Sequence, residues 1–201
     1  MGRPREFDED AALEAAMRVF WEKSYEGATM ANLTEAMGIN RSSMYAAFGD
    51  KESLFRRVME RYREGRMTHI RQALAQPSLR EVVAELIHGT AEFLSTPGNP
   101  RGCLMIQGAL ACSTDTEPVK QTMIDWRKSG DAALKVRLQQ AQSEGELPRE
   151  IQPADFARYL SSVMAGLGIQ AANGATRAKL RGVAEIALRC IETGLWGRAS
   201  G

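Results

Sequence analysis

The stretch between residues 29 and 51 has the residue types and spacing of a nucleic-acid reader. Gly38 can end a helix in the left-handed conformation, and Asn40 can cap a second helix just after it. The sequence therefore predicts two short helices, over residues 30–37 and 41–48, joined by a sharp turn. Because the major groove of DNA admits one helix, such a helix-turn-helix is suited to reading base edges.

Polar groups in and before this stretch suit different parts of DNA. A lysine, a phenol or a hydroxyl at a helix start can bind a phosphate, whereas an arginine suits the guanine edge. An arginine-containing N-terminal arm can reach a phosphate or the minor groove, although such arms are also commonly frayed and solvated. Each residue alone could be an ordinary exposed polar group, so the prediction depends on the set. The predicted contacts are Thr29, Tyr45 and Lys51 for phosphates, Arg41, Ser42 and Ser43 for base edges, and Arg3 and Arg5 in the arm.

Together with a preceding helix predicted over residues 8–24, this stretch resembles the DNA-binding head of the tetracycline-repressor (TetR) family of bacterial transcription regulators. The resemblance covers roughly the first quarter of the chain, and it departs from the family's commoner pattern at Ala46 and Ala47, where larger side chains such as His and Tyr often stand. It implies a homodimeric transcription regulator, of the repressor type, that binds double-stranded operator DNA and responds to a small-molecule effector. The residues that carry it are Phe20, Trp21, Gly27, Thr29, Gly38, Tyr45, Phe48 and Lys51.

The charge of the chain excludes binding to DNA by bulk electrostatic attraction. The formal net charge is +1, and residues 1–57 carry 8 Lys/Arg against 10 Asp/Glu. Residues 51–71 carry 7 Lys/Arg against 3 Asp/Glu, which is a local excess of positive charge after the helix-turn-helix. Affinity for DNA must therefore come from a few placed groups.

A second notable stretch contains Arg101 and Cys103, at the predicted start of a helix over residues 102–111. A helix N-terminus and a nearby cation would favour the thiolate, which could react with oxidants or electrophiles or bind a soft metal such as copper. The element also resembles one seen in several ligand-sensing members of the TetR family, some of which are thiol-based sensors. The alternative is a small buried apolar residue, the commonest fate of a free cysteine. Cys112 would lie on the opposite face of that helix, so no shared metal site is expected.

The hydrophobic pattern predicts an all-α fold of about nine helices, with no period-2 segment of any length. We expect a three-helix DNA-binding head over residues 1–50 and a larger effector-binding and dimerisation domain over residues 51–201. A single rod of about 37 Å over residues 51–75 would connect them, with Gly65 as a possible bend. The other expected helices span residues 78–95, 117–143, one after Pro153, and one after Thr176.

The larger domain offers candidates for two further surfaces. An effector pocket would lie between its helices, and the last two helices carry more apolar and small residues than one bundle face needs, which suits a dimer interface. Internal packing is the alternative for both sets. The pocket candidates are Met67, His88, Phe93, Cys103, Met105, Gln107, Met123 and Trp126, and the interface candidates are Tyr159, Val163, Leu167, Val183, Ala187 and Ile191.

An enzyme is not expected, because the two histidines, His69 and His88, accompany no carboxylate pair, nucleophilic triad or phosphate-binding loop. No cofactor or metal is predicted. Three cysteines without a CxxC pair and an N-terminus without an apolar core favour a cytoplasmic protein. The uncharged run over residues 159–176 is too polar for a membrane span.

Overall fold

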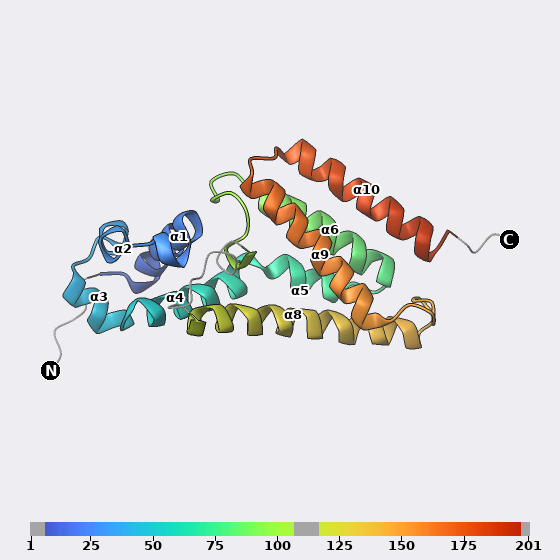
Figure 1. Ribbon diagram of the computed structural model, residues 1–201, viewed down its shortest axis with the longest axis horizontal. Helices are drawn as coiled ribbons and strands as arrows, with labels where there is room; N and C mark the ends of the chain where they lie inside the picture. Colours follow the sequence, from blue (N-terminus) through green and yellow to red (C-terminus); the bar gives the residue numbers. More distant parts are fainter. Residues whose placement is uncertain (1–6, 107–116, 198–201) are drawn as a thin grey trace.

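The computed structural model describes residues 7–106 and 117–197, except for the side chain of residue 118. In these two ranges every regular element is helical, and the molecule is elongated, with the head at one end and the longer helices at the other (Figure 1). The elements are α1 (Glu9–Gly27), α2 (Met30–Met37), α3 (Arg41–Phe48), α4 (Lys51–Arg61), the π-helical segment η1 (Tyr62–Arg66), α5 (Thr68–Leu74), α6 (Leu79–Leu94), α8 (Glu117–Ser143), α9 (Pro153–Ala172) and α10 (Arg177–Leu195).

Side-chain caps start the helices of the head where the sequence predicts them. Asp8, Thr29, Asn40 and Asp50 each accept a hydrogen bond from a backbone N–H of the first turn that follows. Gly38 ends α2 with a φ of 65°, a conformation that costs a glycine little. These caps fix the short turn between α2 and α3, and the predicted helix-turn-helix is confirmed.

The predicted single rod over residues 51–75 is wrong. The α-helix ends at Arg61, η1 adds one wide turn, and Met67 leaves helical geometry before α5 begins. Gly65 lies inside η1, where its low helix propensity makes this break inexpensive. The extra residue in the wide turn keeps Tyr62 in the core while it directs Arg66 toward α1.

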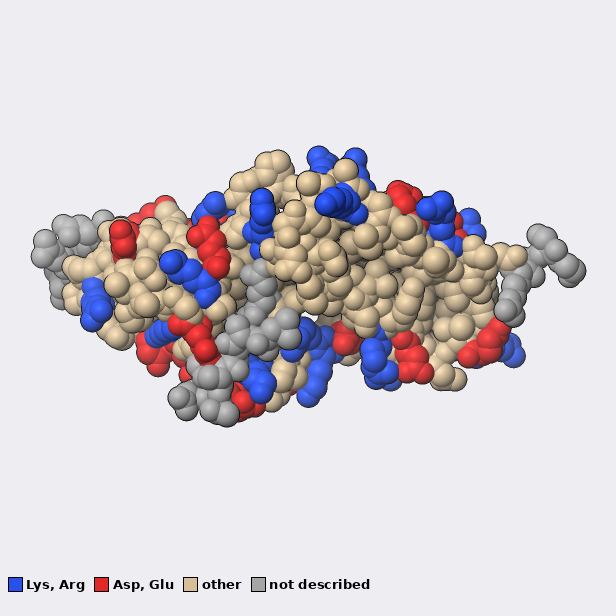
Figure 2. Space-filling view, turned by 45° about the horizontal axis from the view of Figure 1, so that its top comes forward, with Lys and Arg blue, Asp and Glu red and all other residues tan. Residues whose placement is uncertain are grey.

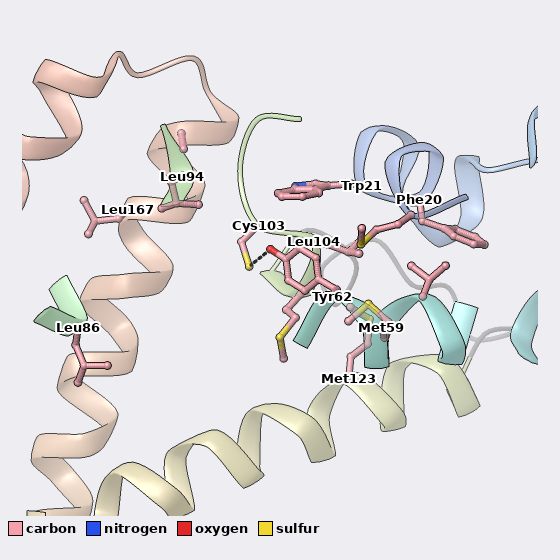
Figure 3. Packing of buried hydrophobic residues seen from close by; sticks show 14 of the residues in the cluster. Phe20, Trp21, Met59, Tyr62, Leu86, Leu94, Cys103, Leu104, Met123 and Leu167 are labelled. Atoms are coloured by element: carbon pink, nitrogen blue, oxygen red, sulfur yellow. Dashed lines mark hydrogen bonds between the residues drawn. The ribbon is translucent and has the colours of Figure 1, made fainter. Parts of the chain in front are cut away.

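One continuous apolar core runs from the head into the body. Phe20 of α1 and Phe55 of α4 pack edge to face at 5.0 Å, and Trp21 meets Tyr62 in the same way. Figure 3 shows Phe20, Trp21 and Tyr62 together with Met59, Leu104 and Met123 at the junction. In the body, α6 packs against α5, α9 and α10, and α8 packs along α9.

A loop that follows α6 ties the body to the head; residues 98–103 are called the junction loop below. Arg18 donates to the Gly98 carbonyl at 2.8 Å, and the Trp21 indole N–H donates to the Gly102 carbonyl at 3.1 Å. The head is thus held from two sides, by the covalent connection through α4 and η1 and by this loop. No helix of the described ranges is both long and apolar enough to cross a bilayer, α9 included.

Candidate DNA-binding surface and effector site

The outer face of α3 presents a small set of groups to solvent. Met44 and Phe48 are buried under the helix, whereas Arg41 is exposed and the Tyr45 side chain is 52% exposed. Ala46 is exposed beside them and can contact a thymine methyl. The face therefore offers one guanidinium, one phenol and a methyl group within a helix that fits the major groove.

Some of the predicted DNA-contact residues already form hydrogen bonds in the helix caps. The Asn40 side-chain oxygen accepts from the Ser43 backbone N–H at 2.8 Å and from the Ser42 hydroxyl at 2.7 Å, and Ser43 is half-buried. Thr29 is exposed and forms a capping box with Asn32, in which its hydroxyl oxygen accepts a bond of 3.1 Å. Its hydroxyl proton can still be donated to a phosphate. Arg3 and Arg5, the predicted arm, lie outside the described residues.

Lys51 lies against the head rather than extending freely from it. Its ammonium is 4.5 Å from the centre of the Tyr25 ring, and the side chain is half-buried. Burial lowers the pKa of Lys51 from its ordinary value, while the charge of Glu26 opposes that shift. The ammonium is thus placed by its neighbours before any phosphate is bound.

The basic residues after the helix-turn-helix face an acidic surface on α1. Three guanidinium groups are ion-paired across the groove between α1 and the α4–η1 segment, and each of these pairs compensates part of the local positive excess. Figure 2 shows acidic and basic side chains interspersed over the face in view. The pairs are Arg57 with Glu9 at 3.3 Å, Arg61 with Asp10 at 2.8 Å, and Arg66 with Glu14.

Cys103 is buried at the junction of head and body. Its sulfur accepts a hydrogen bond of 3.4 Å from the Tyr62 hydroxyl, drawn as a dashed line in Figure 3. Burial raises the pKa of the Cys103 thiol, although the Tyr62 hydroxyl and the backbone N–H groups of Ile106 and Met105 act in the opposite direction. Of the two alternatives for Cys103, this conformation matches the small buried apolar residue, because burial outweighs the effect of the helix start on the thiol. Cys190 is exposed on α10, so of the two places expected for it, the core or an interface, the core is excluded, and Cys112 lies outside the described ranges.

The structure divides the predicted effector-pocket residues between a hollow and the core. A hollow of about 420 Å³, called the α5–α6 hollow below, is lined by two of them, His88 and Phe93. Cys103, Met105 and Met123 are instead buried in the apolar core, where they pack tightly, while Met67 and Trp126 are half-buried and Gln107 is not described. The remaining lining residues are Arg66, Thr68, His69, Glu85, Gly89, Glu92, Ser95, Thr96, Pro97 and Arg177.

Sequence reasoning missed most of this lining because the hollow forms only where α5 packs onto α6. Gly89 permits that approach: a β-carbon there would lie 3.4 Å from the β-carbon of His69. The sequence contains one usable signal, since Glu85, Gly89 and Glu92 follow the spacing of one helix face. A glycine between two carboxylates on one face indicates a close approach of another element beside polar groups.

The predicted dimer residues on α9 and α10 also divide into two groups. Tyr159 is 45% exposed and Val183 is 44% exposed, and Val163 and Ala187 are half-buried. Leu167 and Ile191 face the core of their own chain and are 1% and 5% exposed, so they are not available to a second copy. Two residues that the prediction omitted, Ile169 and Ile186, extend the exposed apolar surface.

Comparison with known proteins identifies the family. A profile described as bacterial regulatory proteins of the tetR family matches residues 12–58, and one for the tetracycline-repressor-like C-terminal domain matches residues 77–187. The chain belongs to the TetR family. It is a helix-turn-helix transcriptional repressor of that family, and this assignment places it among DNA-binding regulators and not among enzymes.

Relatives of known name cover nearly the whole chain. The HTH-type transcriptional repressor ComR of Escherichia coli is 33% identical over 94% of this chain and 90% of its own length. The repressor AcnR of Corynebacterium glutamicum is 27% identical over 87% of each chain. A cysteine-substituted variant of the TetR-family regulator CifR, solved with 26-bp double-stranded operator DNA, is 39% identical, covers 93% of this chain and 98% of its own, and superposes with a TM-score of 0.88.

Proposed function

We propose that this repressor acts as a homodimer, which binds a roughly palindromic operator through two α3 helices and leaves it when an effector binds the body. The observation that carries the proposal is the outer face of α3, where Arg41 and Tyr45 project from a helix whose inner face is fully packed. The operator complex of CifR, at 39% identity, supports the same mode of binding here. Binding to operator DNA supports a cytoplasmic location.

Two heads are needed because each head offers few contacts and little net charge. Half-sites of a palindrome lie about 34 Å or a multiple of it apart, so the two recognition helices must keep that spacing. An effector in the body can change the spacing through α4 and the junction loop, the two connections to the head. A small change in spacing then weakens binding at both half-sites together.

The test measures, by fluorescence anisotropy, the Kd of the protein for the intergenic DNA fragment beside its own gene. Arg41→Ala should raise Kd by about 10- to 100-fold, the effect of losing one good base contact of 1–3 kcal/mol. Arg149→Ala removes an exposed arginine from the α8–α9 connection and should leave Kd unchanged. If the folded dimer binds no such fragment at low salt, the proposal is wrong.

A thiol-reactive or soft-metal effector is the second candidate, favoured by the position of Cys103 beside Tyr62 at the junction. Because Cys103 is buried, a reagent can reach its thiol only when the junction opens, and such an opening would also disturb the contacts to α1. In the described ranges no group of three or more His, Cys, Asp or Glu side chains is placed to hold a metal. The test adds copper(I) or an electrophile to the DNA complexes of wild type and of Cys103→Ser and measures the release of DNA. Equal release from both proteins excludes this candidate.

A further inference from the structure

All but one of the charged side chains that line the α5–α6 hollow are paired with another described residue. Arg66 is held by Glu14 of α1, and Arg177 is held by Glu92. Glu85 lines the same hollow, is half-buried, and has neither a hydrogen bond nor an ion pair in the described part of the chain. A carboxylate without a partner among the described residues can accept charge-assisted hydrogen bonds from a cation that enters the hollow.

The arginines near Glu92 do not cancel this charge. Arg177 and Arg181 both contact Glu92, which leaves one excess positive charge, but their side chains are 55% and 56% exposed, so water screens them. Glu85 precedes Glu92 by seven residues on α6, which is about 10 Å along the helix axis. The negative end of the hollow at Glu85 is therefore separate from its basic rim.

An aromatic wall stands beside the carboxylate. The rings of His69 and Phe93 stack with centroids 5.1 Å apart and planes 20° apart, and both residues line the hollow. Burial lowers the pKa of His69 to about 4, so the imidazole is neutral at neutral pH and does not repel a cation. Flat rings beside an anionic group form an arrangement that binds organic cations.

Close packing brings the carboxylate and this wall together. A β-carbon at Gly89 would lie 3.5 Å from both the Glu85 carboxylate oxygen and the His69 ring, so the two groups meet over the bare glycine backbone. The volume of about 420 Å³ falls within the range of small-molecule sites, which is roughly 300–1,000 Å³. The site thus suits a small ligand with one charged end and one flat apolar part.

Arg66 connects the hollow to the DNA-binding head. It lines the hollow, pairs with Glu14 of α1, and lies 3.4 Å from the side-chain oxygen of Asn99 in the junction loop. An occupant of the hollow therefore contacts a residue at which η1, α1 and the junction loop meet. A second positive charge beside Arg66 would alter its contacts with the head.

We propose that the α5–α6 hollow binds a small organic cation, with an ammonium group on Glu85 and an apolar ring against His69 and Phe93, and that Arg66 relays its presence to the head. The relay rests on the proposed function, because its readout is release from DNA. The binding itself does not depend on that function.

The binding test uses three probes of similar size but different charge: 2-phenylethylammonium, neutral 2-phenylethanol and anionic 3-phenylpropanoate. Calorimetry on the intact protein should show that the cation binds most tightly. Glu85→Gln should raise its Kd by at least about tenfold, since hydrogen bonds to charged groups contribute roughly 1.5–3 kcal/mol. Glu60→Gln, which makes the same charge change in the separate hollow between α1 and α4, should leave the Kd unchanged.

Two results would overturn the binding proposal. One is that 2-phenylethylammonium binds no more tightly than 2-phenylethanol. The other is that wild type and Glu85→Gln bind this cation with equal affinity. Circular dichroism checks the fold of each variant. The relay is then tested by adding the cation to the complex with the intergenic fragment. Release from wild type and from Glu60→Gln, but not from Glu85→Gln, supports it. If the bound cation leaves DNA binding unchanged, the relay alone is wrong. If the protein binds no DNA even without the cation, only the proposed function is wrong.

Discussion

Ser24 stores backbone strain beside the DNA-binding surface. Among the described residues it is the one non-glycine residue with a positive φ, at 59° with ψ at 177°, a region that is nearly exclusive to glycine. The break in α1 turns Tyr25 into the core, where its ring contacts Phe20 and Phe55 and lies under the Lys51 ammonium. The strain is thus compensated by the packing that positions a predicted phosphate contact.

Ser24→Gly should stabilise the protein. Relief of the strain stabilises the folded state, whereas the greater conformational freedom of glycine stabilises the unfolded chain. The net gain in the free energy of unfolding is about 1 kcal/mol, which raises Tm by about 2 to 4 °C. Ser24→Ala retains the β-carbon and should bring no gain. Thermal unfolding of the three proteins followed by circular dichroism checks this, and a lower Tm for the glycine variant would show that the hydroxyl has a role that the strain does not reveal.

His69 should make stability fall at acidic pH. Its pKa in the folded protein, about 4, lies below the ordinary value of 6.5, so the folded state binds fewer protons than the unfolded state between these values. The contribution is complete above pH 6.5 and is lost as pH falls through 4, by about 3 kcal/mol at most. His69→Phe keeps a ring against Phe93 and should reduce the loss of unfolding free energy between pH 7 and pH 4.5, measured by urea denaturation. An unchanged pH profile in the variant would contradict the assignment.

At the scale of elements, the junction loop should act as a structural link between α1 and the body. The indole N–H of Trp21 satisfies the buried Gly102 carbonyl, and Trp21→Phe removes that donor while it retains an apolar ring. We expect a loss of about 1–3 kcal/mol and faster amide hydrogen exchange in residues 98–106. Arg18→Ala, which removes the exposed bond to Gly98, should have a much smaller effect. Equal exchange in wild type and Trp21→Phe would show that this hydrogen bond does not hold the loop.

Local signals in the sequence are sufficient to predict the helices of the head and most helices of the body. Capping residues and Gly38 act within one or two turns, so Thr29 and Asn40 predict the starts of α2 and α3 correctly. The break after Arg61 depends on how Tyr62 packs and how Arg66 pairs with another helix, which no local pattern contains. The proposed boundary at residue 50 between the two domains likewise depends on long-range packing, because α4 shares the core of α1.

The candidate sites were less predictable because they depend on which face of a helix is covered. The sequence pattern groups Leu167 with Val163 and Ile191 with Ala187, yet Leu167 and Ile191 are covered by their own chain. The effector-pocket prediction relied on residue type and so favoured sulfur-containing and aromatic side chains, which the core also uses. Glu85 was missed because a lone glutamate on a helix is ordinary until its neighbours are known.

At the scale of the whole molecule, the charge distribution makes DNA binding depend on two heads. The acidic side of α1 pairs with Arg57 and Arg61, so these arginines contribute little free charge to a phosphate backbone. Few placed groups remain on each head, and a single head should bind weakly. Joining two heads raises the overall affinity by a factor of about 10² to 10⁴ when their spacing fits the operator.

The exposed apolar surface of α9 and α10 should therefore control DNA affinity from the far end of the molecule. Val183→Glu introduces a charge at an exposed position, so the chain should fold normally while the proposed dimer dissociates, and Kd for the operator fragment should rise by about 100-fold or more. Val136→Glu makes the same change on α8 at a position that is 64% exposed, and should alter neither property. Sedimentation velocity and anisotropy on both variants test this. A Val183→Glu dimer with full affinity would exclude Val183 from the interface, and dissociation by Val136→Glu would move the interface to α8.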